Sequence, residues 1–298
     1  MKILITGSTG LLGQALSRKL APRGELTGLS RHAPEAAAAR HIVCDLRDRA
    51  RTAEAVRGLQ PDVVIHAQAF SDVDRCEQEP VEAEAMNIGA TANLLEALQG
   101  SPAWLIHISS DYVFDGTRGR PYDEADAPNP LGVYGRTKLA SERLVLSRPL
   151  GFVVRVSTLF GQGRKTFCDQ IVQRLRAGQT VEAFMDQTTS PSFTDDVAEG
   201  LGDLIGALQR PSLPGRILHL VNAGGCSRVE WARCVAEILG LPMGGIQAVP
   251  MARAGRAASR PAYSALTTRV GLELIGRTLR PWQEALEIYL RRQYAPAP

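Results

Sequence analysis

The sequence predicts an α/β protein built on a doubly wound parallel sheet, with a smaller, interwoven region in the C-terminal half. Three observations predict it: short apolar runs alternate with helical segments up to Phe160, a glycine-rich turn follows the first run, and the alternation ends after Phe160. Crossovers of this length place parallel strands beneath helices on both faces. At 298 residues, with 44% hydrophobic and 22% charged residues, the chain can bury such a core.

The elements of the first half alternate between strand and helix. Strands are predicted at residues 2–5, 25–30, 41–44, 62–66, 104–109 and 152–156, and helices at 11–20, in the 50s, at 81–98 and at 136–146. The turn-rich Pro128-Asn129-Pro130 precedes the last of these helices. This order is typical of a Rossmann-type sheet.

The second half of the chain does not continue the regular alternation of strands and helices. Glycine and proline turns separate mixed helices and loops after Phe160, and amphipathic helices are predicted at 229–239 and 281–291. Residues 195–208 and 217–221 read as elements that return to the main sheet. We therefore expect a first domain over 1–160, to which 195–222 returns, and a second region over 161–298.

A glycine-rich turn from Thr6 to Gly13 joins the first strand to the first helix. Its glycines suit a sharp reversal, close approach of the backbone to a pyrophosphate, and tight packing of helix on strand. A glycine turn can also serve packing alone, but this one follows a predicted strand and opens a predicted helix. The first domain is therefore expected to bind a dinucleotide, with contacts from Gly7, Gly10, Leu11, Leu12 and Gly13.

The end of the second predicted strand bears on which dinucleotide is bound. The acidic residue that would accept from the adenosine ribose is missing, and Ser30 and Arg31 stand there instead. An arginine would bind the 2′-phosphate of NADP, so NADP(H) is favoured and NAD(H) stays an alternative. The other reading of Arg31 is a solvated loop charge. Asp45 and Leu46, after the third strand, are candidates for the adenine edge, and Asp45 is otherwise a helix cap.

Ser110, Tyr134 and Lys138 form the candidate catalytic group. Ser110 follows the fifth predicted strand, where the loops of an open α/β sheet meet ligands. Tyr134 and Lys138 are four residues apart, so on a helix they share one face, and we expect the ammonium to favour the ionised phenol. With Ser110 donating to a carbonyl oxygen, Tyr134 delivering a proton and Lys138 holding the nicotinamide ribose, a ketone could accept hydride. The alternatives are a turn cap for Ser110 and a core position for Tyr134.

Together these motifs resemble the extended short-chain dehydrogenase/reductases and, within them, the dTDP-4-dehydrorhamnose reductase family. The resemblance covers nearly the whole chain. It rests on Thr6 to Gly13, Val73 to Glu77 leading to Asn87, Ser109 to Gly116, Tyr134 to Glu142, Asp186-Gln187 with Ser190-Pro191, and Arg260-Pro261.

The resemblance implies an NADP(H)-dependent reduction of the C4 ketone of a nucleotide-bound deoxysugar, with dTDP-4-dehydro-L-rhamnose as the first candidate. It makes Ser110, Tyr134 and Lys138 catalytic, and Asn87 would order the active-site backbone or a proton-relay water. Asn87 is otherwise a helix residue with local hydrogen bonds. A homodimer is compatible with the resemblance, and so is Mg²⁺ at an interface, for which no ligands are identified.

Further contacts are implied by the same resemblance. Ala67 and Ala69, with Tyr134 and Lys138, would touch the cofactor, and Asp111, Tyr112, Thr158, Gln187, Arg260 and Tyr263 the substrate. The Arg260 guanidinium could pair with a diphosphate. The family tends to have Arg-x-Ser-Trp-Leu where this chain has Thr158 in fourth place, and Arg-Pro-x-Asn-Ser where it has Tyr263. Since pocket contacts decide which substrate is favoured, the identity of the sugar stays open.

Two alternatives to a reductase also stay open. A sugar-nucleotide epimerase would use the same Tyr134 and Lys138 for a transient oxidation. A non-catalytic NADP-binding regulatory subunit, similar to that of methionine adenosyltransferase, fits the altered substrate positions but fits the intact catalytic group less well. Dehydratases of the superfamily carry Asp-Glu where this chain has Asp111-Tyr112, which argues against dehydration.

Composition argues against several other classes. A net charge of +3, spread along the chain, is too small to predict nucleic-acid binding. No stretch approaches the roughly 18 apolar residues of a membrane span, so a cytoplasmic protein is expected. The 5 cysteines are scattered without C-x-x-C, against a disulfide framework or zinc ribbon. His66, His107 and His219 are expected in the core rather than on a metal, and no metal site is predicted.

Overall fold

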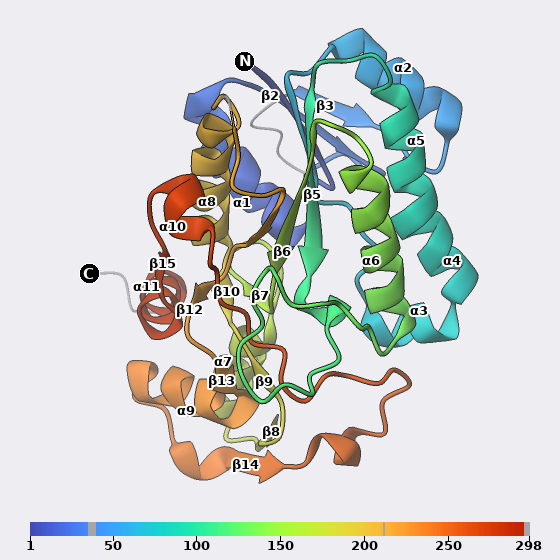
Figure 1. The fold of residues 1–298 in the computed structure, drawn as a ribbon. Helices are drawn as coiled ribbons and strands as arrows, with labels where there is room; N and C mark the ends of the chain where they lie inside the picture. Colours follow the sequence, from blue (N-terminus) through green and yellow to red (C-terminus); the bar gives the residue numbers. More distant parts are fainter. Residues whose placement is uncertain (35–39, 211, 295–298) are drawn as a thin grey trace.

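The computed structural model describes residues 1–34, 40–210 and 212–294 (Figure 1). Its main layer is a seven-stranded parallel sheet in the order β11-β6-β5-β4-β1-β2-β3. The strands are β1 (Lys2–Thr6), β2 (Glu25–Ser30), β3 (Arg40–Val43), β4 (Val63–His66), β5 (Trp104–Ser110), β6 (Gly151–Val156) and β11 (Ile217–His219). Strand order reverses direction between β1 and β4, which confirms the predicted doubly wound sheet.

Helices cover both faces of the sheet (Figure 1). The first face carries α1 (Leu11–Leu20) and α8 (Thr194–Ala207), and the second carries α2 (Arg49–Leu59), α5 (Ala90–Ala97) and α6 (Val133–Leu146). Successive residues of β1 serve the two faces in turn, because side chains alternate along a strand. Ile3 and Ile5 belong to the core beneath α1 and α8, and Leu4 belongs to the core beneath α2 and α5.

The predicted helix over 81–98 contains a π-helical turn. After α3 (Val73–Gln78), α4 (Pro80–Glu84) passes through the π turn η2 (Ala85–Gly89) into α5. The Asn87 carbonyl accepts hydrogen bonds from the hydroxyls of Thr91 at 2.6 Å and Ser141 at 2.9 Å. Apolar periodicity does not reveal such a one-residue widening, which is frequent at functional sites.

The second region lies at one end of the sheet, around α7 and α9 in Figure 1. Its helices are α7 (Phe167–Arg176), α9 (Arg228–Leu239) and α11 (Trp282–Tyr294), whereas α10 (Gly271–Ile275) packs against α8 beside the main sheet. Short strands pair two by two: β7 (Leu159–Phe160) with β10 (Ser192–Phe193), β8 (Val181–Phe184) with β14 (Ile246–Val249), β9 (Thr188–Thr189) with β13 (Cys226–Ser227), and β12 (Asn222–Ala223) with β15 (Leu279–Pro281). Short 3₁₀ turns lie in the first region at η1 (Ala21–Arg23) and η3 (Asp111–Val113), and in the second at η4 (Met243–Gly245) and η5 (Met251–Ala254).

Two elements of the second half join the main layer. Helix α8 packs against α1, and β11 pairs with β6 in parallel. Both lie within the stretch 195–222 or at its edge. The division of the chain into two domains with those boundaries stays a prediction.

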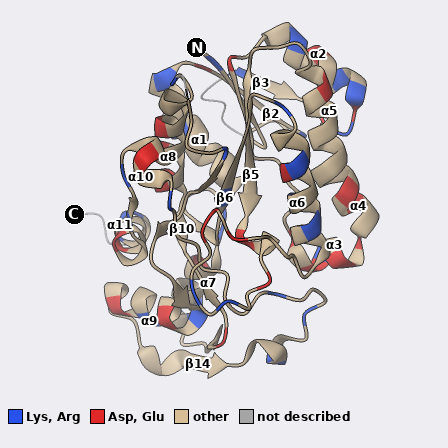
Figure 2. Cartoon of the chain, in the orientation of Figure 1, with Lys and Arg blue, Asp and Glu red and all other residues tan. Residues whose placement is uncertain are grey.

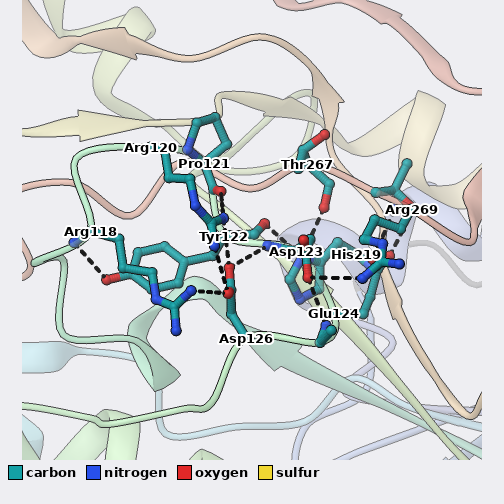
Figure 3. Close-up of polar contacts among 12 residues, drawn as sticks. Arg118, Arg120, Pro121, Tyr122, Asp123, Glu124, Asp126, His219, Thr267 and Arg269 are labelled. Carbon is teal, nitrogen blue, oxygen red and sulfur yellow. Dashed lines mark hydrogen bonds and ion pairs between the residues drawn. The ribbon is translucent and has the colours of Figure 1, made fainter.

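A polar cluster ties the loop after β5 to the C-terminal segment (Figure 3). The Glu124 carboxylate accepts from the backbone N–H of His219 at 2.9 Å, from that of Arg269 at 2.9 Å and from the hydroxyl of Thr268 at 2.8 Å. Hydrogen bonds to a charged acceptor are the strong ones. The β5–α6 connection and the chain after residue 260 therefore hold each other in place.

The surface and the cysteines add little specific chemistry. Basic and acidic residues are interspersed along the helices (Figure 2). In the part of the chain that the structure describes, no helix is long and apolar enough to cross a membrane, and no cluster of three or more His, Cys, Asp or Glu residues could hold a metal. The five cysteines are free thiols, and all but Cys234 are buried.

Candidate active site

A cleft of about 570 Å³ lies at the carboxyl ends of the central strands. It includes the point where the strand order reverses, which is where open α/β sheets bind ligands. Fifteen predicted site residues line it: Gly7, Gly10, Leu11, Leu12, Gly13, Ser30, Arg31, Ala67, Ala69, Ser110, Asp111, Tyr112, Tyr134, Lys138 and Thr158. The structure thus brings the glycine turn and the candidate catalytic group into one cleft.

The turn between β1 and α1 has the shape of a phosphate site. Gly7 has φ +68°, and a Cβ there would lie 2.8 Å from the backbone of Gln68. A Cβ on Gly13 would lie 2.2 Å from the Gly7 carbonyl oxygen, so α1 packs directly on the turn. Gly10 precedes α1, and no side chain caps the first turn of this helix. Its free N–H groups and its dipole suit an anionic group such as a pyrophosphate.

Two buried polar atoms in the cleft also fit a polar ligand. Gln68 Nε2 and Ser109 Oγ have no hydrogen-bond partner among residues 1–34, 40–210 and 212–294, and both residues line the cleft. Buried polar groups are nearly always hydrogen-bonded in folded proteins. These unpartnered atoms and the open first turn of α1 therefore fit a cleft that holds a polar, anionic ligand such as a dinucleotide.

The residues predicted to hold the adenosine end differ in position. Arg31 is exposed at the cleft, and Ser30 lies beside it with its hydroxyl donating to the His32 carbonyl at 2.6 Å. Asp45 and Leu46 lie outside the cleft. The Asp45 carboxylate pairs with Arg47 at 2.6 Å, and Leu46 is fully buried in the core.

Tyr134 stands in the first turn of α6, one residue before a glycine that fixes the helix. A Cβ on Gly135 would lie 2.2 Å from the Tyr112 carbonyl oxygen, so α6 approaches η3 closely. Ser110 donates to Asp111 Oδ1 at 2.9 Å and accepts from the Tyr112 N–H at 3.2 Å. Burial raises the pKa of Tyr134, and a hydrogen bond with Ser110 offsets only part of this effect.

Lys138 is 1% exposed, and its Nζ lies 3.1 Å from His107 Nε2. Burial lowers the pKa of Lys138 to about 7, although Glu142 acts in the opposite direction. His66, whose ring is 5.2 Å from that of His107, has its pKa lowered to about 3 by burial and by Lys138. The pKa of Tyr134 was expected to be lowered by Lys138, but in this structure burial raises it, and the Lys138 Nζ is directed at His107.

Asn87 lies behind the cleft rather than in its lining. Its Oδ1 accepts from the Phe70 N–H at 2.8 Å, and its Nδ2 donates to Thr137 Oγ1 at 2.9 Å. The side chain therefore joins the loop after β4 to α6. It acts on the site by holding the helix that carries the tyrosine and the lysine.

Asp111 is a buried carboxylate that connects three parts of the chain. It accepts from the hydroxyls of Ser110 at 2.9 Å, Ser157 at 2.9 Å and Ser264 at 2.6 Å. Burial raises the pKa of Asp111, and these hydroxyls counteract it. The ends of β5 and β6 and the segment after residue 260 thus meet at one group.

A second cleft of about 690 Å³ adjoins the first. Of the predicted substrate residues it takes Tyr112, Gln187 and Arg260. Arg260 pairs bidentately with Asp74 at 2.7 and 2.9 Å, so its charge already has a protein partner. Tyr263 lines neither cleft, and its backbone bridges to Thr188.

The sequence analysis overlooked Arg228, the first residue of α9, which lines both clefts. Its guanidinium stacks near Phe167 and Trp231, with 5.2 and 5.3 Å to the ring centroids. Nothing local in the sequence marks it, because an arginine at the start of an amphipathic helix is usually a surface charge. Its position follows from the way α9 packs against α7.

Comparison with known proteins gives consistent matches. The model of the RmlD substrate binding domain family matches residues 1–295. A dTDP-4-dehydrorhamnose reductase of Mycobacterium tuberculosis H37Rv is 37% identical over 292 residues, 96% of this chain and 91% of that protein. That of Salmonella typhimurium is 32% identical over 301 residues, 99% and 98% of the two chains. A solved dTDP-4-dehydrorhamnose reductase of Bacillus anthracis in complex with NADP has a TM-score of 0.87 at 28% identity, covering 98% of this chain and 99% of that one.

Proposed function

We infer that this chain, which belongs to the RmlD substrate binding domain family of dTDP-4-dehydrorhamnose reductases, uses NADPH to reduce the C4 ketone of a nucleotide-bound deoxysugar. The first substrate to test is dTDP-4-dehydro-L-rhamnose, and the product would be dTDP-L-rhamnose. The observation that carries the proposal is that Ser110, Tyr134 and Lys138 line the same cleft as the glycine turn.

The cofactor would be held by the backbone around Gly10 and by two cations. Arg31, which lines the cleft, would bind a 2′-phosphate and so favour NADP(H) over NAD(H), and Lys138 would bind the nicotinamide ribose. When bound, the reduced nicotinamide supplies a hydride. A nicotinamide-dinucleotide complex in a relative supports this choice of cofactor.

Tyr134 serves as the proton donor. Because burial raises its pKa, the phenol stays protonated at neutral pH and can give its proton to the oxygen that becomes a hydroxyl. Ser110, whose hydroxyl now donates to Asp111, would turn to donate to the substrate carbonyl oxygen. Lys138 in its ammonium form would stabilise the phenolate left behind.

The test is NADPH consumption with enzymatically generated dTDP-4-dehydro-L-rhamnose, beside NADH and a control without substrate. Turnover with a reduced sugar product supports the proposal. NADPH binding without turnover would contradict the proposed substrate. Isomerisation of the sugar with no net NADPH consumption would establish an epimerase instead.

Arg31→Asp sharpens the cofactor part of the proposal. It should shift the NADPH-to-NADH ratio of kcat/KM toward NADH by roughly 10- to 100-fold, since a charged contact is replaced by a repulsion. An unchanged ratio would remove Arg31 from the cofactor site. Arg57→Asp, a last-turn arginine of α2 whose side chain is exposed, is the matched charge change.

A further inference from the structure

Arg228 lies at the junction of the two clefts. Its Nη2 lies 3.5 Å from Thr158 Oγ1 and its Nε lies 3.5 Å from Gln187 Oε1. Both contacts are long for N–H···O bonds, which are usually about 2.9 Å. A guanidinium has five N–H donors, so most of the hydrogen-bonding capacity of Arg228 is left for a ligand.

The charge of Arg228 is not matched by a protein carboxylate. Among the ion pairs within 4.0 Å in the described part of the chain, none includes Arg228, whereas Arg256 and Arg260 in the same cleft both pair with Asp74. Asp111 acts on Arg228 from a longer distance, and its oxygens already accept from serine hydroxyls. Among the same described residues, Arg174 of the second cleft also has no carboxylate partner within that distance, but it lines the second cleft alone, whereas Arg228 faces both clefts and can attract an anion at their junction.

The neighbouring amide supports a polar ligand at this place. Gln187 is 2% exposed and lines the second cleft, and its Nε2 has no hydrogen-bond partner among residues 1–34, 40–210 and 212–294. The Arg228 Nε–H fixes the orientation of this amide, because it can face only the carbonyl oxygen of Gln187, which leaves the NH₂ donor as the unpartnered end. Gln187 and Arg228 thus present unused donors side by side.

We propose that Arg228 binds the diphosphate of the sugar nucleotide, with Gln187 as a second donor. The inference rests on the proposed function, because the ketone of the sugar must lie at Ser110 and Tyr134 in the first cleft. The nucleoside then takes the second cleft, and the group that joins sugar and nucleoside crosses the junction. A diphosphate is the anionic part of such a molecule, and a guanidinium fork matches its oxygens. Arg260, held by its pair with Asp74, would line the part of the second cleft that takes the nucleoside.

The test compares ligand binding by the NADPH-loaded full chain and its variants. Calorimetry would give the Kd of dTDP, UDP and thymidine for wild type, Arg228→Met, Arg228→Lys and Arg233→Met. Methionine keeps the length that stacks near Trp231, and lysine restores a charge without the fork. Arg233 is exposed on the same helix, so its variant controls for net charge. Thermal unfolding confirms that each variant folds.

The expected result is a Kd for nucleoside diphosphate that rises about 10- to 100-fold in Arg228→Met and less in Arg228→Lys, with thymidine and NADPH unaffected. The KM of the sugar nucleotide would rise with it while kcat changes little. Equal diphosphate affinity in wild type and Arg228→Met overturns the inference, and so does a wild type that binds neither diphosphate.

Two further outcomes separate the inference from the proposed function. If dTDP binding depends on Arg228 but dTDP-4-dehydro-L-rhamnose is not turned over, the inference holds and the proposed substrate is wrong. If dTDP binding is independent of Arg228 while the KM of the complete sugar nucleotide still rises in Arg228→Met, Arg228 contacts the sugar, and the diphosphate assignment is overturned.

Discussion

Two arginines, one in each region, show how differently this protein uses a partly or fully buried cation. Arg155 in β6 is 2% exposed and meets the Glu142 carboxylate with Nε at 2.9 Å and Nη2 at 2.7 Å. Arg228 in α9 has two 3.5 Å contacts to neutral oxygens and faces both clefts. Arg155 is thus paired within the protein, whereas Arg228 is free to bind a ligand.

The difference teaches how to separate structural from functional charges. A buried charge is costly unless it is paired, so a buried arginine without a carboxylate partner at the edge of a cleft is a candidate for pairing with a ligand. Arg155 also lies over the Phe114 ring at 5.1 Å, so its guanidinium is paired along its edge and covered by an aromatic ring within the fold. Removing a partner from Arg155 should therefore damage stability, whereas changing Arg228 should damage binding.

The largest expected effect comes from breaking the buried ion pair between Arg155 and Glu142. Glu142→Gln should lower the free energy of unfolding by about 3–5 kcal/mol, because it leaves the Arg155 charge buried without a carboxylate. Urea unfolding measures it. Glu96→Gln is the matched control, since Glu96 pairs with Arg49 at the surface and its loss should not change the unfolding midpoint measurably. Equal effects at both sites would contradict the distinction.

A tyrosine in each region extends the comparison to hydroxyl groups. Tyr134→Phe should keep NADPH binding and the fold but reduce turnover by roughly 10²-fold or more, because only the proton donor is lost. Tyr289→Phe should lower the thermal unfolding temperature and leave turnover nearly unchanged, because Tyr289 lies in the core of the second region and donates to Asp169 at 2.7 Å. Steady-state kinetics and thermal unfolding of both variants decide it. A fully active Tyr134→Phe would remove Tyr134 from catalysis.

Lys138 is an intermediate case, a buried cation beside a neutral histidine. Its pKa of about 7, lowered by burial, means that it is largely uncharged above neutrality before an anion binds. A bound dinucleotide raises that pKa, so binding takes up a proton above pH 7 and the Kd of NADPH should rise with pH. The Kd can rise by at most about tenfold per pH unit, and it stops rising above the pKa that Lys138 has in the complex.

The Kd of NADPH, measured from pH 6 to pH 9, tests this sign. Below pH 7 Lys138 is charged in both states, so its contribution to the Kd should be flat. Lys138→Met should bind more weakly at pH 6 and lose the rise above pH 7. A Kd that falls as the pH rises through this window would contradict the assignment of Lys138 to the cofactor.

The sequence predicts the first region well because its signals are local. Strand, glycine turn and helix adjoin one another, and parallel strands bring their carboxyl ends to one edge, which places Ser110 in the same cleft as the turn at Gly10. The spacing of Tyr134 and Lys138 works in the same way, since both lie on α6. Such features need no knowledge of long-range packing.

The second region is predicted less well because its contacts join distant segments. Asp111 meets Ser264 across 153 residues, and Arg260 meets Asp74 across 186. No residue pattern predicts either contact. The sequence therefore suggested Arg260 as a partner for a diphosphate without its pair with Asp74, and it gave no sign of Arg228. The role of Asp45 at the adenine edge stays a prediction, and its carboxylate pairs with Arg47 two residues away. The role of a charged residue depends on whether the protein supplies its partner, and that partner is known only from the fold.

The smallest expected effect concerns Thr158, which touches Arg228 and has φ +21°, at the edge of the left-handed region that disfavours a β-branched residue. Thr158→Ala removes the hydroxyl and keeps a Cβ in this conformation, whereas Thr158→Gly removes both. The glycine variant should therefore be more stable than the alanine variant by about 1 kcal/mol, measured by urea unfolding. Both should bind dTDP within about twofold of wild type, since a contact of 3.5 Å contributes little. A large loss of dTDP affinity in both variants would mean that Thr158 holds Arg228 in place. The position of Arg228 would then depend on a protein contact, as that of Arg155 does.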